Sequence, residues 1–136
     1  MTRRSRVLAG AAALLALAGC GRAAGPVELT AATPAYSVVL TVPAPVVGTS
    51  EALVRIVDRS GDPVDDREVE VAPVMADMGH AVPAVAAAPA DRPGEYRTTG
   101  GELFSMSGPW DVDVHISPAA GGAAETARFR VLVSDR

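Results

Sequence analysis

The sequence has few of the residues that build covalent and metal-binding sites. It contains one cysteine among 136 residues, so no disulfide can form within a single chain. With that cysteine used for lipid attachment, as argued below, cysteine-based zinc sites and thiol catalysis are excluded. Aromatic residues make up 4% of the chain, and there are two histidines. Stability must therefore come from the packing of mainly aliphatic side chains.

Basic residues are also scarce. Lysine is absent, and twelve arginines face sixteen acidic residues. Removal of residues 1–19, which form the signal peptide predicted below, leaves nine arginines and a net charge of −7. Nucleic acids and anionic lipid surfaces attract proteins that present a basic face. We therefore expect no nucleic-acid partner.

Motifs of common catalytic sites are missing as well. The sequence has no Gly-x-Ser-x-Gly element, no evident Ser-His-Asp arrangement and no glycine-rich phosphate loop. Many of the acidic residues lie on predicted strands whose alternation exposes them to solvent. We therefore expect that the protein is not an enzyme.

The most specific motif present is the Leu-Ala-Gly-Cys sequence that ends at Cys20. It follows a basic segment and an apolar run over residues 7–18, which is too short to span a bilayer but suits the apolar region of a signal peptide. The motif resembles the lipobox of bacterial lipoproteins, whose signal is cut before a lipid-bearing cysteine. We predict a signal peptide over residues 1–19 and an extracytoplasmic protein that is anchored to the cell membrane by lipid on Cys20.

Short strands separated by turn-forming residues account for most of the remaining chain. The small, proline-containing segment over residues 20–35 is typical of a flexible tether, so we expect the folded domain to cover residues 36–136. No convincing amphipathic helix is present. About seven short strands with turns every 8 to 12 residues predict an all-β, immunoglobulin-like antiparallel β-sandwich. The expected strands are residues 37–42, 52–57, 68–72 (ended by Pro73), 81–87, 95–98, 110–117 and 129–133.

The clearest two-residue period follows Trp110. It predicts that Trp110 and the aliphatic residues at 112, 114 and 116 face the core, whereas Asp111, Asp113 and His115 face solvent. Tyr96 follows a Pro-Gly turn. It is either a tyrosine corner, whose hydroxyl bonds to the backbone across the turn, or an ordinary aromatic of an amphipathic strand.

A methionine and histidine cluster is the strongest candidate binding site. Met75, Met78 and His80 fall within six residues, and Met106 lies on a later connection that could close the site. Thioethers are soft neutral ligands that favour Cu(I), and imidazole also binds copper. The sequence therefore predicts a Cu(I) site formed by these four residues, with His115 as a poorer candidate on the solvated face.

The geometry of the cluster leaves two interpretations open. In an extended strand Met78 and His80 share one face and Met75 points to the other, so a bend, which Gly79 permits, is needed for all three to converge. Methionine is also a common gap-filler in cores. The alternative is thus an immunoglobulin-like interaction module in which the cluster is structural.

Five blocks of the sequence, at 61–64, 69–71, 75–80, 93–96 and 104–112, contain the motif positions Met75, Met78, His80, Tyr96, Met106 and Trp110. Together these blocks resemble the YtkA-like domain family, which is related to FixH-like proteins. The resemblance covers about residues 36–134 and implies a small extracytoplasmic immunoglobulin-like domain, often membrane-attached, found with copper handling or respiratory oxidase assembly. A copper-handling or oxidase-assembly protein is accordingly the expected partner.

Overall fold

Nine strands and one short 3-10 helix occur in residues 25–136, the part of the chain that the computed structural model describes. The predicted signal peptide and Cys20 lie outside these residues. No helix within the described part is long and apolar enough to cross a membrane. The elements in chain order are β1 (Val27–Ala32), β2 (Tyr36–Val42), β3 (Leu53–Asp58), β4 (Arg67–Met75), η1 (Ala76–Met78), β5 (His80–Ala81), β6 (Val85–Pro89), β7 (Glu95–Thr98), β8 (Gly108–Pro118) and β9 (Glu125–Val133).

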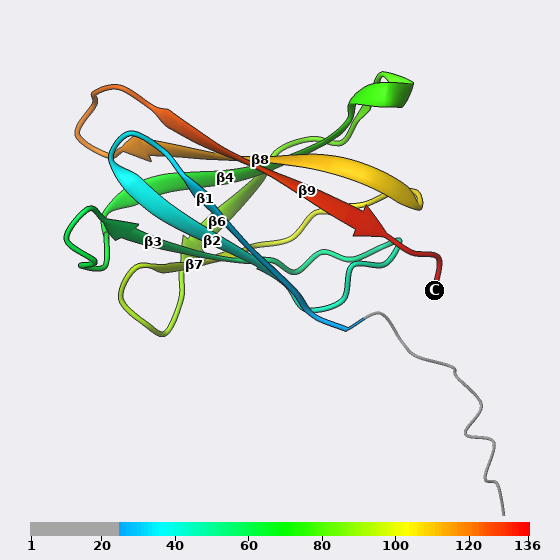
Figure 1. Cartoon of the computed structure of the whole chain (residues 1–136), viewed down its shortest axis with the longest axis horizontal. Coiled ribbons are helices and arrows are strands. Elements are labelled where there is room, and N and C mark those ends of the chain that lie inside the picture. The colour runs from blue at the N-terminus through cyan, green and yellow to red at the C-terminus, as the bar shows by residue number, and fades with distance from the viewer. Residues whose placement is uncertain (1–24) are drawn as a thin grey trace, which may run out of the picture.

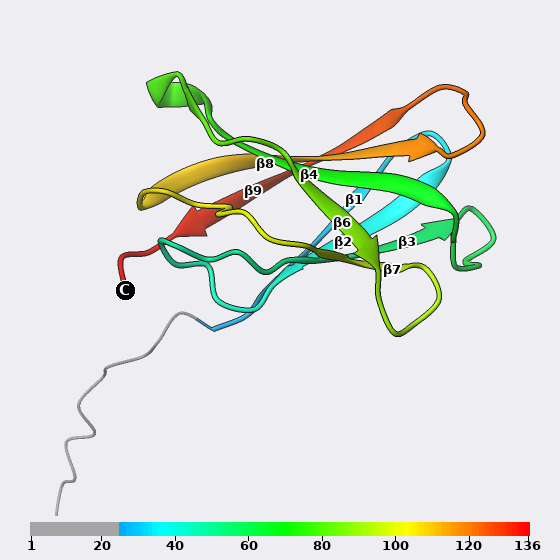
Figure 2. The same ribbon diagram turned by 180° about the vertical axis from the view of Figure 1, so that it is seen from behind.

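The strands form one antiparallel sheet that folds over into two layers, as Figures 1 and 2 show. The order is β1-β2-β3-β7-β6-β4-β8-β9, and β5 pairs with β4. Strand β6 pairs with β7 along one part of its length and with β4 along another, so it connects the two layers. Strand β1 also contacts β9, which nearly closes the sheet. The predicted all-β sandwich is confirmed.

The core lies between the two layers and follows the two-residue period. Along β8, Trp110, Val112, Val114 and Ile116 are buried, as predicted. Strand β9 contributes a second row of alternate buried side chains. Because each strand buries every other residue, nearly all the aliphatic packing comes from one face of the folded sheet.

Strand β1 corrects the predicted start of the folded domain. Residues 27–32 were expected to belong to a flexible tether, yet they pair along their whole length with β2, from Val27 opposite Val42 to Ala32 opposite Ser37. The prediction failed because this segment consists largely of small residues and has few large apolar side chains. Its backbone hydrogen bonds to β2 and its contacts with β9 hold it in the sheet.

Strand β4 corrects the expectation that Pro73 ends a strand. The strand continues to Met75, and Pro73 lies opposite Val112 of β8. On its other side β4 pairs with β6 up to Val71 and with β5 from Val74, so Pro73 falls where the partner strand changes. A missing N–H is tolerated at such an interruption of the ladder.

Tyr96 forms the backbone contact expected of a tyrosine corner. Its ring is buried, and its hydroxyl donates a 2.8 Å hydrogen bond to the carbonyl oxygen of Val64, which precedes β4. Burial raises the pKa of the Tyr96 hydroxyl above its ordinary value of 10.0. The bond links β7 to the turn that leads into the opposite layer.

Candidate metal site

The site begins with a tight reversal of the chain after β4. Met75 is the last residue of β4, η1 follows it, and Gly79 ends η1 in the left-handed conformation at φ 61°. Glycine suits this position because it has no Cβ to clash. The chain then returns as β5, with His80 directly opposite Met75. Figure 1 shows η1 standing off the end of the sheet.

This reversal supplies the bend that the sequence required. It places Met75 and His80 side by side as cross-strand neighbours, so their side chains lie on the same face of the sheet. Met78 occupies the tip, and its side chain is 68% exposed. The two-residue period had paired Met78 with His80. The structure pairs Met75 with His80 because the 3-10 turn interrupts the extended backbone.

Two side chains hold the His80 ring from outside its own hairpin. The Nε2 atom lies 2.9 Å from the Ser105 hydroxyl oxygen. The ring also packs against the buried indole of Trp110, with centroids 5.8 Å apart and planes at 75°. His80 itself is half-buried at the surface. These two contacts fix the position of the imidazole ring.

Ser105 and Met106 belong to the connection between β7 and β8, which is fixed at several points. Leu103 donates its N–H to Thr49, and the Phe104 carbonyl accepts the N–H of Gly48. The Trp110 indole Nε1 donates to the Met106 carbonyl oxygen at 3.0 Å. Leu103 and Phe104 are themselves buried in the core. The loop residues that face His80 are thus held on both sides.

The three methionines differ sharply in exposure. Met75 is 2% exposed, and its Cε would lie 3.2 Å from a side-chain Cβ at Gly108, so glycine at 108 makes room for the thioether. Met106 is partly buried and packs against the core. The structure therefore gathers Met75, His80 and the Met106 loop around Trp110, and leaves Met78 in solvent at the tip.

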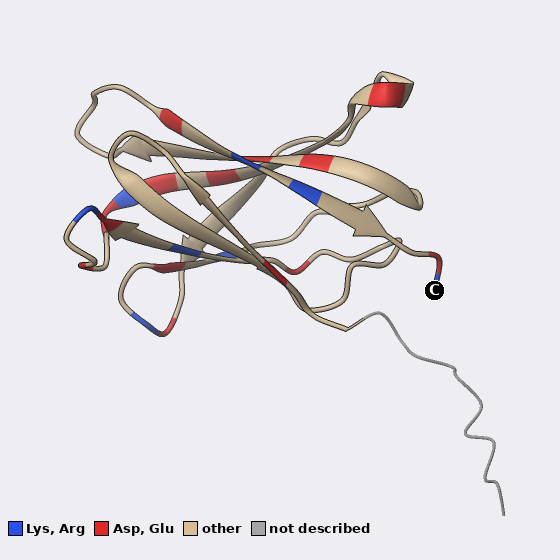
Figure 3. Ribbon diagram, in the orientation of Figure 1, with Lys and Arg blue, Asp and Glu red and all other residues tan. Residues whose placement is uncertain are grey.

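Charged residues near the tip are paired with one another. Arg130 on β9 lies 3.6 Å from Asp77 of η1 and 3.2 Å from Asp111 of β8. Figure 3 shows acidic and basic residues on β8 and β9 and an acidic residue on η1. Within residues 25–136 no group of three or more His, Cys, Asp or Glu side chains could hold a metal ion. Met75, Met106 and His80 instead carry thioethers and one imidazole, donor types that suit a soft cation.

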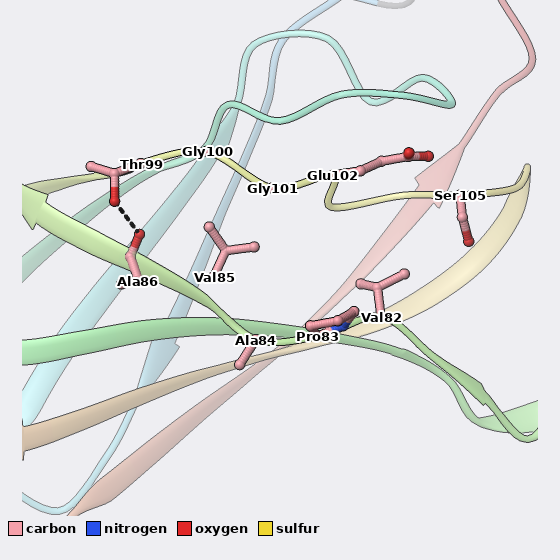
Figure 4. Close-up of a pocket in the computed structure, with 10 residues that line it drawn as sticks. All are labelled: Val82, Pro83, Ala84, Val85, Ala86, Thr99, Gly100, Gly101, Glu102 and Ser105. Carbon is pink, nitrogen blue, oxygen red and sulfur yellow. Dashed lines mark hydrogen bonds between the residues drawn. The ribbon is translucent and has the colours of Figure 1, made fainter.

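A surface pocket of about 450 Å³ adjoins Ser105. Figure 4 shows that its walls come from the β5–β6 connection, from the start of β6 and from the chain between Thr99 and Ser105. Most of the lining is small or aliphatic, and Glu102 is the one charged residue in it. Ser105 therefore lies between this pocket and the His80 ring.

His115 lies on the outer face, as predicted. Its Nδ1 is 2.9 Å from the Thr126 hydroxyl oxygen, and it lies opposite Glu70 of β4 in the sheet register. It is not among the groups that surround Trp110.

Sequence reasoning missed Ser105. The serine lies within the motif block that contains Met106, but it is 25 residues from His80 and its type alone marks no site. The path of the β7–β8 connection is what brings Ser105 next to the His80 ring. The ion pair of Asp77 with Arg130 was missed for the same reason, since it joins η1 to a strand at the other end of the chain.

The fold and this arrangement define a small antiparallel β-sandwich domain with a methionine and histidine hairpin at one end. The chain belongs to the YtkA-like family, whose family model matches residues 30–115. This match contains all four predicted ligand positions and Trp110. No curated protein and no solved structure matches the chain.

Proposed function

We propose that this YtkA-like domain binds Cu(I) outside the cytoplasm and that lipid on Cys20 attaches it to the membrane. The observation that carries the copper proposal is the juxtaposition of Met75 and His80 across the hairpin, beside the Met106 loop. Neutral thioethers and an imidazole select Cu(I) over harder divalent ions. The partner would be a copper-handling or oxidase-assembly protein, and the domain would not be catalytic.

The ligands have different roles in this proposal. His80 and Met106 lie at the surface of the site, and Met75 forms its inner wall. Met78 is exposed on the projecting tip, where a flexible thioether is free to fold over a bound ion or to contact an incoming one. The site would thus have a buried fixed side and a mobile outer side.

The test is a competition titration with a Cu(I)-specific chelator under anaerobic conditions. We expect the wild-type domain to compete and His80→Ala to bind more than about tenfold more weakly, because losing even a supporting partner of a metal ligand typically costs that much. Met75→Leu, Met78→Leu and Met106→Leu remove sulfur with little change in volume and should weaken binding while the domain stays folded. His115→Ala is the matched control and should bind like the wild type, because His115 lies on the outer face. The copper proposal fails if the wild type does not compete, or if His80→Ala competes equally well.

One observation favours the second candidate, a non-catalytic interaction module with a structural cluster. Met75 is as buried as the aliphatic core around it, which is the environment of a packing methionine. On this interpretation the titration would show no binding by any variant, and the projecting hairpin would serve as a contact surface. The same experiment therefore decides between the two candidates.

The membrane attachment has its own test. Cys20→Ala removes the only cysteine and should abolish the lipid-anchored form. We expect the wild type to remain with membranes after a high-salt wash and the variant to be released or to stay unprocessed. Processed Cys20→Ala protein that resists the same wash would contradict the anchor.

A further inference from the structure

The Ser105 hydroxyl contacts one of the two imidazole nitrogens of His80 and leaves the other without a hydrogen bond among the described residues. The Ser105 hydroxyl oxygen lies 2.9 Å from Nε2, and among residues 25–136 no hydrogen bond engages Nδ1. An imidazole that binds a metal through one nitrogen usually donates the N–H of the other to an oxygen atom, which fixes the tautomer and orients the ring. The His80 ring has this second contact already in place.

The position of Ser105 is itself well fixed. Phe104, on one side, is buried, and its carbonyl accepts a hydrogen bond from Gly48. Met106, on the other side, accepts the indole N–H of Trp110 through its carbonyl oxygen. The same indole packs against the His80 ring. Trp110 therefore helps to fix both the His80 ring and, through Met106, the loop that carries the Ser105 hydroxyl.

We propose that Ser105 is a positioning residue, which accepts the Nε2–H of His80 and leaves the Nδ1 lone pair for the metal. This role rests on the proposed Cu(I) site. It assigns Nδ1 as the ligand atom and makes an exposed serine, absent from the predicted ligand set, part of the site. Loss of the hydroxyl would leave the ring free to exchange tautomers and to turn about its side-chain bonds.

The first experiment needs no metal. Long-range ¹H–¹⁵N NMR correlations of the metal-free domain report the tautomer of each histidine ring at a pH where it is neutral. We expect His80 to be mainly the Nε2–H tautomer in the wild type, and to become a mixture in Ser105→Ala. Ser105→Thr keeps a hydroxyl and should restore the wild-type pattern. Ser107→Ala lies on the same loop, has no side-chain hydrogen bond among the described residues, and should change nothing.

The second experiment measures Cu(I) affinity for the same four proteins by chelator competition. Ser105→Ala should bind about 10- to 100-fold more weakly, the usual effect of removing such a supporting contact, and Ser105→Thr should recover most of the loss. A wild type that binds Cu(I) but holds His80 as the Nδ1–H tautomer would overturn the role of Ser105. Unchanged affinity in Ser105→Ala would do the same. A wild type that binds no Cu(I) would instead refute the proposed function, and with it any metal-directed role for Ser105.

Discussion

Trp110 serves both the core and the candidate site. It is fully buried, packs against Phe104 with ring centroids 5.7 Å apart, and also packs against the His80 ring. Its indole N–H also ties down the Met106 loop. Trp110 thus anchors both the hairpin that carries His80 and the loop that carries Met106 to the core of the sandwich.

We expect Trp110→Ala to lower the free energy of unfolding by about 3 to 5 kcal/mol, as other large core truncations do. Trp110→Phe should cost less, because it keeps part of the packing and loses mainly the hydrogen bond to Met106. Urea unfolding followed by far-UV circular dichroism measures both. A loss below about 1 kcal/mol for Trp110→Ala would be incompatible with its position in the core.

For individual residues, the sequence predicted the direction of the side chain wherever the strand is regular. The alternation after Trp110 correctly predicted which residues of β8 face inward and that His115 faces outward. It could not predict the Met75 and His80 pair, because a 3-10 turn ending in a left-handed glycine lies between them. Nor could it find Ser105, whose contact depends on the path of a distant loop.

On the outer face of β8 and β9, acidic and basic residues alternate across the two strands. Asp113 accepts two hydrogen bonds from the Arg128 guanidinium, at 2.7 and 2.8 Å. These bonds and the nearby positive charge hold the pKa of Asp113 below its ordinary value of 3.8. The pair joins neighbouring strands on the face opposite the core.

The lowered pKa of Asp113 gives stability a defined pH dependence. A carboxyl whose pKa is lower in the folded state stabilises the fold above its unfolded pKa, and the contribution is lost as the pH falls through the folded value. We expect the wild type to lose stability below about pH 4 more steeply than Asp113→Asn. Thermal unfolding between pH 7 and pH 2 measures the difference.

Glu68→Gln is the control for this comparison, because Glu68 is exposed on β4 and forms no ion pair within the described residues. Its acid profile should follow that of the wild type. Parallel profiles for wild type and Asp113→Asn would show that the Arg128 contact does not persist in solution.

Element boundaries were harder to predict than element types. Both errors concerned segments whose composition argues against a strand, the small residues of β1 and the proline within β4. In each case pairing with neighbouring strands outweighed local propensity. The number of strands rose from about seven to nine because β1 was taken for a tether and β5 was not separated from β6.

At the scale of the whole molecule, the start of β1 and the candidate site lie at the same end of the sandwich. Val27 is paired with Val42, and the loop that follows Val42 is bonded to Leu103 and Phe104. The turn at Ser60 lies at the opposite end, because Tyr36 at the start of β2 is opposite Asp58. Figure 1 shows the same arrangement, with η1 and the start of β1 on one side and the β3–β4 turn on the other.

This arrangement predicts how a lipid on Cys20 would orient the domain. Six residues separate Cys20 from Val27, and seven Cα–Cα steps span at most about 25 Å. The test uses nitroxide labels on two variants of the lipidated protein, Met78→Cys and Ser60→Cys. A lipid that carries chelated nickel relaxes a nitroxide more strongly the closer the label lies to the bilayer. We expect the label at 78 to relax more strongly than the label at 60.

Insertion of about 20 Gly and Ser residues after Gly25 should reduce this difference, because a long flexible linker lets the domain tumble. Equal relaxation at both positions without the insertion, or stronger relaxation at 60, would contradict the orientation.

With the proposed metal site and lipid anchor, the position of Val27 also bears on how metal would reach or leave the domain. A site held within a few nanometres of the bilayer and facing it meets other proteins of the same membrane at a high effective concentration, in the way that two linked modules meet. A freely diffusing carrier must instead enter the narrow layer of solvent beneath the domain. The early start of β1 would thus favour exchange between neighbours on one membrane over exchange with carriers in solution.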